Sequence, residues 1–203
     1  SVYDYGSTTD GTFYYVMELL DGLDARTLVE RFGPQPEERV ISLLLQACES
    51  LEEAHERGLV HRDVKPANIF VSRQGLEVDF VKVLDFGLVK SLTNPSETVL
   101  SDNGVLGTPA YIAPEVAMGS PAPDARTDLY GLGAVAYWLL TGQEIFTGDT
   151  PVAVALQHVQ AEPVPPSCRT ELEICSDLEA VVLSCLAKDP NDRFRLMGFG
   201  HRV

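Results

Sequence analysis

Two short runs of polar residues carry the chemistry that this sequence offers. The first is His61-Arg62-Asp63-Val64-Lys65-Pro66-Ala67-Asn68, and the second, Asp85-Phe86-Gly87, follows further along the chain. Together they supply an acid that accepts a proton, a fixed positive charge, and amide and carboxylate oxygens that suit a hard cation. Phosphoryl transfer from Mg·ATP requires these groups. The sequence therefore predicts a phosphoryl-transfer site built from the two runs.

Composition limits the classes of protein to which this chain can belong. Of its 203 residues, 45% are hydrophobic and 22% are charged, as is usual for one globular domain. The 15 basic and 30 acidic residues give a net charge of -15, which repels nucleic acid and anionic membranes. We therefore expect no nucleic-acid partner. The acidity suits basic protein substrates, or it serves only as a solvated surface.

Cysteine spacing and hydropathy bear on the cellular compartment. The cysteines have no C-x-x-C spacing and no histidine at zinc-ligand spacing, which indicates reduced thiols in a reducing compartment. No apolar stretch reaches the roughly 18 residues of a membrane span, and the longest, around residues 131–140, is typical of a buried helix. We expect no membrane segment in this chain and a cytoplasmic location for it.

The first part of the chain predicts a hairpin and a long helix. Phe13-Tyr14-Tyr15-Val16-Met17 is rich in aromatic and β-branched residues and follows the turn signal Thr8-Thr9-Asp10-Gly11, so it is expected to pair with a strand that begins near Val2. Residues 36–57 carry apolar side chains at helical spacing, with proline at the start and glycine just past the end. This pattern predicts a largely buried helix.

The remainder predicts two short strands and then mostly helix. Strands are expected at residues 69–72 and 81–84, on either side of a turn. An apolar central helix is expected over residues 129–140, with Thr127-Asp128 supplying the polar groups at its start.

Two further amphipathic helices are predicted in the last part of the chain, at residues 151–160 and 177–187. Between the second strand and the central helix, residues 90–108 show no periodicity and are long for a connection in a compact domain. Such a segment usually marks a functional loop.

Six motifs, in this order, resemble those of bacterial Hanks-type serine/threonine protein kinases. They are Val16-Met17-Glu18, the run from His61 to Asn68, Asp85-Phe86-Gly87, the run from Gly107 to Glu115, Asp128-x-x-Gly131 and Lys188-Asp189-Pro190-x-x-Arg193. The resemblance covers residues 1–194. It implies an α+β, protein-kinase-like fold, mainly the α-helical large lobe (residues 21–194) with the last strands of the small lobe and the hinge (residues 1–20).

By this resemblance, the chain is expected to transfer phosphate from ATP, with Mg²⁺, to Ser and Thr hydroxyls of protein substrates, itself included. Asp63 is the general base, and Lys65 neutralises charge on the γ-phosphoryl group. Asn68, the third catalytic residue, and Asp85 are expected to hold the metal through hard oxygens. The alternative for Asp85 is a simple turn residue before Gly87.

The resemblance also implies a nucleotide site. The expected residues are Met17, Glu18, Leu20, Asp24, Phe70, Leu84 and Asp85. Met17 is expected to be the gatekeeper, although a methionine alone is more often a core residue than a cofactor contact. The carbonyl of Glu18 and the amide of Leu20 face the adenine edge, and Asp24 reaches a ribose hydroxyl. Phe70 and Leu84 line the floor.

Structural roles follow for other motif residues. Phe86 is expected to stack on His61, and Asp128 is expected to cap the backbone of the catalytic run. Glu115 and Arg193 should form a buried ion pair, in which loss of one partner costs about 3–5 kcal/mol.

Residues 88–112 are expected to form an activation segment that is regulated by phosphorylation, with Thr98 and Ser101 as candidate sites. Arg62 is expected to be a buried guanidinium that a phosphate on this segment would satisfy.

Two features depart from the family pattern. The residues before Asp63 contain no G-x-G-x-x-G run and no lysine, because Lys65 is the first lysine. The chain is therefore expected to begin inside the small lobe and to be nearly inactive alone, since positioning of the phosphates dominates this catalysis. Residues 195–203 form an atypical tail that resembles a citrate synthase segment, for which chance or a chimeric gene is the preferred explanation over a second activity.

A second class of function stays open. It is a non-catalytic, kinase-like protein-binding module that docks partners on the surface near residues 145–158. The intact Asp63, Lys65, Asn68 and Asp85 favour an enzyme, because a binding module has no chemical need for them. Kinases of this type often carry a membrane span after the kinase domain, so a full-length parent is expected to be membrane-anchored in some cases.

Overall fold

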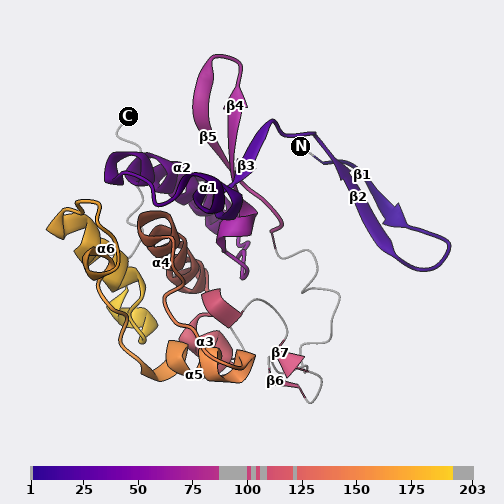
Figure 1. Cartoon of the computed structure of the whole chain (residues 1–203). Coiled ribbons are helices and arrows are strands. Elements are labelled where there is room, and N and C mark those ends of the chain that lie inside the picture. Colours follow the sequence, from indigo (N-terminus) through magenta and orange to yellow (C-terminus); the bar gives the residue numbers. More distant parts are fainter. Residues whose placement is uncertain (1, 87–99, 102–103, 106–108, 121–122, 194–203) are drawn as a thin grey trace.

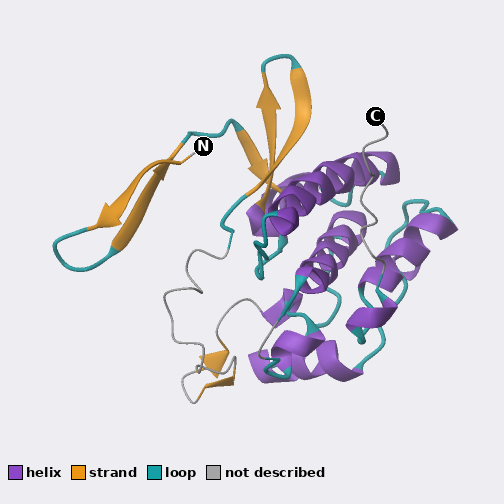
Figure 2. Cartoon of the chain, turned by 180° about the vertical axis from the view of Figure 1, so that it is seen from behind, coloured by secondary structure: helices purple, strands orange, loops and turns teal. Residues whose placement is uncertain are grey.

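The computed structural model describes residues 2–86, 100–101, 104–105, 109–120 and 123–193, and every structural statement below is confined to them. Helices form most of the regular secondary structure, and the strands belong to three small antiparallel sheets at the edges of the helical body (Figures 1 and 2). The expected α+β class is therefore confirmed.

The chain begins with the predicted hairpin, which projects away from the helices (Figure 1). Strands β1 (Val2–Ser7) and β2 (Phe13–Met17) pair antiparallel, with a bulge between Val2 and Asp4. Tyr3 and Tyr5 of β1 are 69% and 73% exposed. A hairpin with such exposed side chains gains little from burial, and an isolated two-stranded sheet is at best marginally stable.

A second sheet has the strand order β3-β4-β5 and contains β3 (Gly22–Asp24), β4 (Ile69–Gln74) and β5 (Glu77–Val83). Strands β4 and β5 extend further into their turn than the residues 69–72 and 81–84 that were expected. Strand β3 was not expected. It approaches β4 so closely that a Cβ on Gly22 would lie 2.1 Å from the carbonyl oxygen of Val71, so only glycine fits there.

Two helices precede the predicted site. Helix α1 (Ala25–Phe32) was not expected from the sequence, whereas α2 (Glu37–Glu56) lies where residues 36–57 predicted a helix. Pro36 occupies the N-cap position of α2, and Gly58, with φ of 75°, follows its end. The fixed φ of proline and the left-handed glycine explain why the sequence located both ends.

The rest of the helical body contains α3 (Pro114–Ala117), α4 (Ala125–Thr141), α5 (Pro151–Gln160) and α6 (Ser176–Cys185). The expected start of the central helix was wrong. Helix α4 begins at Ala125, where Asp124 accepts a hydrogen bond from the amide of Arg126, so Thr127 and Asp128 lie inside the helix. Two-residue strands β6 (Leu100–Ser101) and β7 (Gly104–Val105) pair within the segment that showed no periodicity.

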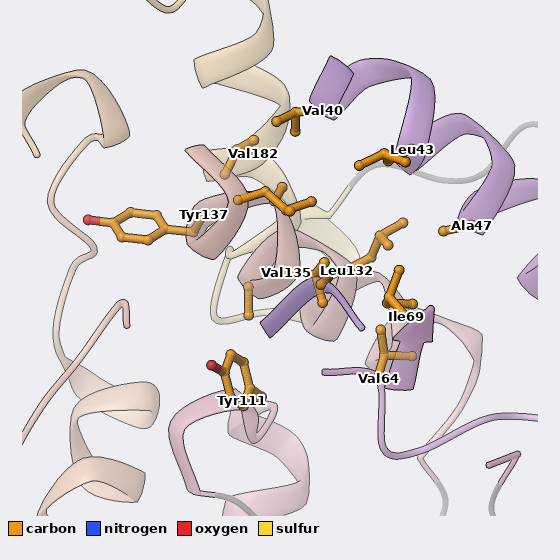
Figure 3. Close-up of a cluster of buried hydrophobic side chains, with 14 of the residues drawn as sticks. Val40, Leu43, Ala47, Val64, Ile69, Tyr111, Leu132, Val135, Tyr137 and Val182 are labelled. Carbon is orange, nitrogen blue, oxygen red and sulfur yellow. The ribbon is translucent and has the colours of Figure 1, made fainter. Parts of the chain in front are cut away.

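Helix α4 is the centre of the core. It packs against both α2 and α6, and almost all of its residues are buried. Figure 3 shows Leu132, Val135 and Tyr137 of α4 among side chains of α2, α6 and β4. Gly133 lets α6 approach, because a Cβ there would lie 2.7 Å from the Cβ of Cys185. An all-round apolar helix is expected at such a position.

None of the helices in the described residues is both long and apolar enough to span a bilayer.

Candidate active site

The catalytic run, residues 61–68, connects the end of α2 to β4. Its last residues form a 3-10 turn, η1 (Pro66–Asn68), that leads directly into the strand. The side chains of Lys65 and Asn68 converge on Asp63: Lys65 Nζ lies 2.8 Å from Asp63 Oδ2, and Asn68 Nδ2 lies 3.3 Å from the same oxygen. Asn68 Nδ2 also donates to the Asp63 carbonyl at 2.8 Å. The three predicted catalytic residues therefore form one hydrogen-bonded group.

Asp128 of α4 binds the backbone at the start of this run. Its carboxylate is 1% exposed and accepts hydrogen bonds from the backbone amides of His61 (2.8 Å) and Arg62 (2.7 Å). The predicted cap on the catalytic backbone is thus present. His55 Nε2, in the last turn of α2, adds a third contact to the carboxylate at 2.7 Å. Hydrogen bonds to a buried carboxylate are among the stronger ones in proteins.

The contact of His55 was missed from the sequence. The one available signal was a histidine at the inner face of the predicted helix, next to Ala54, which is buried.

The backbone of the run adopts a conformation that needs this support. Arg62 has φ of 64°, in the left-handed region, where a side-chain-bearing residue is strained by about 1–3 kcal/mol. Gly131 of α4 allows the run to lie against the helix, since a Cβ there would be 2.7 Å from both the Cβ and the carbonyl oxygen of Val64. Within the Asp128-x-x-Gly131 motif, Asp128 therefore caps the catalytic backbone, and Gly131 leaves the space that this backbone occupies.

His61 joins the catalytic run to the residues before Asp85. Its Nδ1 accepts a hydrogen bond from the Asp63 amide at 3.2 Å, so its Nε2 carries the proton that is donated to the Leu84 carbonyl at 2.7 Å. The ring of Phe86 packs on His61 with centroids 4.7 Å apart, which confirms the predicted stacking. The imidazole is fully buried, so both of its nitrogens are used without water.

The two predicted metal-binding residues lie on adjacent backbone segments. The Leu84 amide donates to the Asn68 carbonyl at 2.8 Å, so Asp85 follows directly after a residue paired with Asn68. Asp85 is exposed and has φ of 59°. Because Asn68 uses Nδ2 toward Asp63, Oδ1 is the atom that it can offer to a cation.

This donor set fits magnesium. An amide oxygen and a carboxylate are hard ligands, and Mg²⁺ is usually held by one or two such groups together with substrate phosphates. No group of three or more His, Cys, Asp or Glu that could hold a metal occurs among the described residues. Asn68 and Asp85 offer two hard oxygen groups, and together they suit a cation that takes its other ligands from phosphate.

Several of the predicted nucleotide residues share one face of the second sheet. Phe70 lies opposite Asp24 on one neighbouring strand and opposite Lys82 on the other. Residues directly opposite in an antiparallel sheet point to the same face. Lys82 Nζ contacts Glu18 Oε1 at 2.8 Å, which brings Glu18 to this face, and the hydrogen bond lowers the pKa of Glu18 to about 2.

The structure separates the predicted nucleotide residues into two groups. Met17, Glu18, Leu84 and Asp85 line a cavity of about 730 Å³ that also reaches residues of α2, whereas Leu20, Asp24 and Phe70 are not among its lining residues. The α2 residues Gln46, Glu49, Ser50 and Glu53, which line the same cavity, were not predicted from the sequence.

Asp24 has a second role that the sequence did not reveal. Its carboxylate accepts hydrogen bonds from the amide (2.9 Å) and the hydroxyl (2.7 Å) of Thr27, so it is the N-cap of α1. Because α1 was not expected, a capping role for Asp24 was not expected either.

The predicted ion pair of Glu115 and Arg193 is confirmed. Arg193 is fully buried, and its guanidinium contacts both oxygens of Glu115 at 2.8 and 2.7 Å. Burial alone would raise the pKa of Glu115, but the hydrogen bonds from Arg193 and Thr127 outweigh it, and the pKa lies below its usual value. This bidentate pair fixes the start of α3 to the end of the described chain.

Part of the expected activation segment lies outside the described residues, as do Thr98 and residues 195–203. Ser101 is described only as part of the backbone of β6. The expectation that Arg62 is buried was wrong, because this residue is exposed. Of these two neighbours, only His61 has a buried side chain.

The family follows from a comparison with known proteins. The protein kinase domain family matches residues 2–199, and the chain therefore belongs to the protein kinase family. It is 44% identical over 198 residues to the serine/threonine-protein kinase PknB of Mycobacterium tuberculosis. It is 43% identical over 190 residues to a probable serine/threonine-protein kinase of Corynebacterium efficiens. These similarities confirm the predicted resemblance to bacterial Hanks-type kinases.

The chain spans only part of these relatives. The two alignments cover 96% and 90% of this chain but 31% and 27% of the relatives. Among solved structures, the chain is similar to Rad53 in complex with AMP-PNP, with a TM-score of 0.75, 27% identity, and coverage of 95% of this chain and 46% of that chain. The kinase domain of M. tuberculosis PknI gives a TM-score of 0.67, 28% identity, and coverage of 95% and 64%. The predicted kinase-like fold is thus confirmed.

Proposed function

We propose that this chain carries the catalytic half of an ATP-dependent protein serine/threonine kinase. The observation that supports this proposal best is the group formed by Asp63, Lys65 and Asn68, in which a carboxylate, an ammonium and an amide meet at one oxygen. The proposed substrates are Ser and Thr hydroxyls of proteins, including those of the chain itself.

Asp63 acts as the general base in this proposal. Its carboxylate is partly exposed, so it can accept a hydrogen bond from an incoming hydroxyl and take the proton as the bond to phosphorus forms. Lys65 neutralises charge on the transferring phosphoryl group. Asn68 fixes the carboxylate and the backbone of Asp63 at once, which keeps the base in one orientation.

We propose that ATP and Mg²⁺ bind beside this group. Asn68 Oδ1 and Asp85 would hold the metal, which supplies charge neutralisation to the phosphates when bound. Met17, Glu18 and Leu20 are the proposed adenine contacts. Phe70 and Leu84 are proposed for the floor of the site. For Asp24 a ribose contact competes with its bonds to Thr27, so its contribution is expected to be the smallest of the set.

The proposed division places the small-lobe remnant and the hinge at residues 1–20 and the large lobe at residues 21–194. Because the 203-residue sequence has no glycine-rich loop and no lysine before Asp63, we expect slow transfer by this chain alone. The reaction is placed in the cytoplasm, where ATP is available. The alternative is a non-catalytic docking module, favoured by Val152 and Leu156 of α5, which are 54% and 52% exposed.

Single-turnover transfer from γ-labelled ATP to a Ser/Thr-containing basic protein tests the proposal. Purified chain at high concentration should label the protein slowly, in a Mg²⁺-dependent manner. Asp63→Asn should reduce the rate by about 100-fold or more. Glu30→Gln, which alters an exposed ion pair of α1, is the matched acid-to-amide control and should change the rate by less than twofold.

Equal labelling by the chain and by its Asp63→Asn variant would exclude Asp63 as the general base. Absence of both labelling and Mg²⁺-dependent binding of a fluorescent ATP analogue would favour the docking module instead.

A further inference from the structure

A row of alternating cationic and aromatic side chains lies beside α5, away from the catalytic run. Lys188 Nζ lies 4.7 Å from the ring centroid of Phe146, and that ring meets His158 edge-on at 5.0 Å. His158 then contacts Tyr130, whose hydroxyl lies 2.7 Å from its Nδ1. Arg193 stacks on the other side of Tyr130 at 4.9 Å. We call these five residues the His158 row.

His158 is the central member and projects from the buried face of α5. Its side chain is fully buried, and its Nδ1 is paired with the Tyr130 hydroxyl. Its Nε2 is directed toward the backbone of Ala110 but makes no hydrogen bond of normal geometry within the described chain. The Nζ of Lys188 is likewise buried without a hydrogen-bond partner there. Neither of these two buried nitrogens therefore makes a hydrogen bond of normal geometry within the described chain.

The charges around His158 oppose the addition of a proton. The titratable or charged groups on the elements that pack around α5 are Glu115 of α3, Tyr111 of η2 (Pro109–Tyr111), Tyr130 of α4, Glu162 just after α5, and Lys188 and Arg193 after α6. Of the two carboxylates, Glu115 is already engaged by Arg193 and Thr127, and Glu162 is exposed and acts on Lys188. A protonated imidazole would thus be a third cation beside anions that other cations already engage.

The ring is accordingly neutral in the folded chain. Burial, followed by the nearby Lys188, lowers the pKa of His158 to about 4. Protonation at a higher pH requires the ring to leave its site and reach water. The movement that achieves this with the least loss of structure is release of α5, a ten-residue helix whose buried residues are only Val154, Ala155 and His158.

We propose that His158 is a proton-sensitive latch. The neutral ring holds α5 against α4 and η2, and a protonated ring releases α5 while the catalytic run stays bound to Asp128. The latch is a property of the fold and does not depend on the kinase activity proposed above. It makes the end of the molecule where α3 and α5 pack together responsive to acid.

Hydrogen exchange of the 203-residue chain, followed by mass spectrometry, tests the latch directly. After correction for the intrinsic effect of pH on exchange, the protection of α5 amides should fall by roughly tenfold or more between pH 6.5 and pH 4.5. The amides of α2 provide the internal control, and their protection should stay within twofold.

Two variants identify the group responsible. His158→Gln removes the titration but keeps an acceptor for the Tyr130 hydroxyl, so the acid-induced loss of protection in α5 should disappear. Lys188→Met removes the neighbouring cation and should make the loss smaller; it carries the test if His158→Gln does not fold. The latch is wrong if His158→Gln responds to acid as the original chain does, or if α2 and α5 lose protection together.

Discussion

Two buried polar clusters on the same helix differ in how completely their groups are paired. Around Asp128, one carboxylate meets three donors at 2.7–2.8 Å, and the group next to it, His61, uses both ring nitrogens. Around His158, two buried nitrogens, Nε2 of His158 and Nζ of Lys188, make no hydrogen bond of normal geometry within the described chain. Asp128 and Tyr130 are near neighbours in α4, so one helix carries a satisfied cluster toward the catalytic run and an unsatisfied one toward α5.

The difference has an electrostatic reason. The Asp128 cluster has one negative charge that several N–H groups stabilise, and hydrogen bonds to a buried charge are strong. The His158 row has two cations and aromatic faces, which attract cations more weakly than a carboxylate does. The Asp128 cluster therefore holds the backbone of the catalytic run rigidly, whereas the His158 row holds α5, which can detach.

The largest expected effect comes from removing the centre of the satisfied cluster. Asp128→Ala leaves two buried amides and His55 without an acceptor, next to the strained backbone of Arg62. We expect the free energy of unfolding to fall by about 3–5 kcal/mol, measured by urea denaturation. Asp124→Ala, which removes a partly exposed cap of the same helix, is the control and should cost about 1 kcal/mol. A loss from Asp128→Ala no larger than that of the control would contradict the comparison.

Acid should affect the unsatisfied cluster first. The pKa of His158 is about 4 in the folded chain and 6.5 when unpaired in water, so the unfolded chain binds more protons between these values. Its contribution to stability is complete above pH 6.5 and is lost as the pH falls toward 4. The expected loss is about 3 kcal/mol, seen as the difference between the original chain and His158→Gln in urea denaturation at pH 7 and pH 4. Parallel pH profiles for the two proteins would contradict it.

The satisfied cluster was largely predictable from the sequence, because its parts lie in short motifs. The spacing of Asp63, Lys65 and Asn68 indicated the polar group that these side chains form, and the cap by Asp128 followed from the family resemblance. The periodic helices α2, α4 and α5 were found for the same local reasons. His55 was missed, since its contact with Asp128 joins residues far apart in sequence and no local pattern marks it.

The unsatisfied cluster could not be predicted at all. The sequence placed His158 only in a predicted amphipathic helix and at the end of a possible docking surface. Neither periodicity nor a motif indicates which buried nitrogens have hydrogen-bond acceptors. Strand β3 and helix α1 were missed for a related reason. A three-residue strand such as β3 depends on its partner β4, which lies far along the chain, and local propensity contributes little to so short an element.

Gly131 offers a smaller perturbation of the satisfied cluster. Gly131→Ala places a methyl group 2.7 Å from Val64 Cβ and from its backbone oxygen, so the catalytic run must move away from α4. We expect a loss of about 1–3 kcal/mol from this overpacking, although alanine favours helix in general. Thermal denaturation provides the measurement, with Ala136→Gly in the same helix as a control for propensity. A stabilised Gly131→Ala variant would show that the run tolerates displacement.

The smallest expected effect is at Lys188, and its size distinguishes most directly between the Asp128 cluster and the His158 row. Removing this buried cation takes away its attraction to Phe146 and to Glu162 but also relieves its desolvation, which already lowers its pKa. These terms oppose one another, so Lys188→Met should change the free energy of unfolding at pH 7 by less than about 1 kcal/mol. The measurement is urea denaturation beside Asp128→Ala under the same conditions. A loss of about 3 kcal/mol or more would mean that Lys188 has a strong partner and that the two clusters are equally well satisfied.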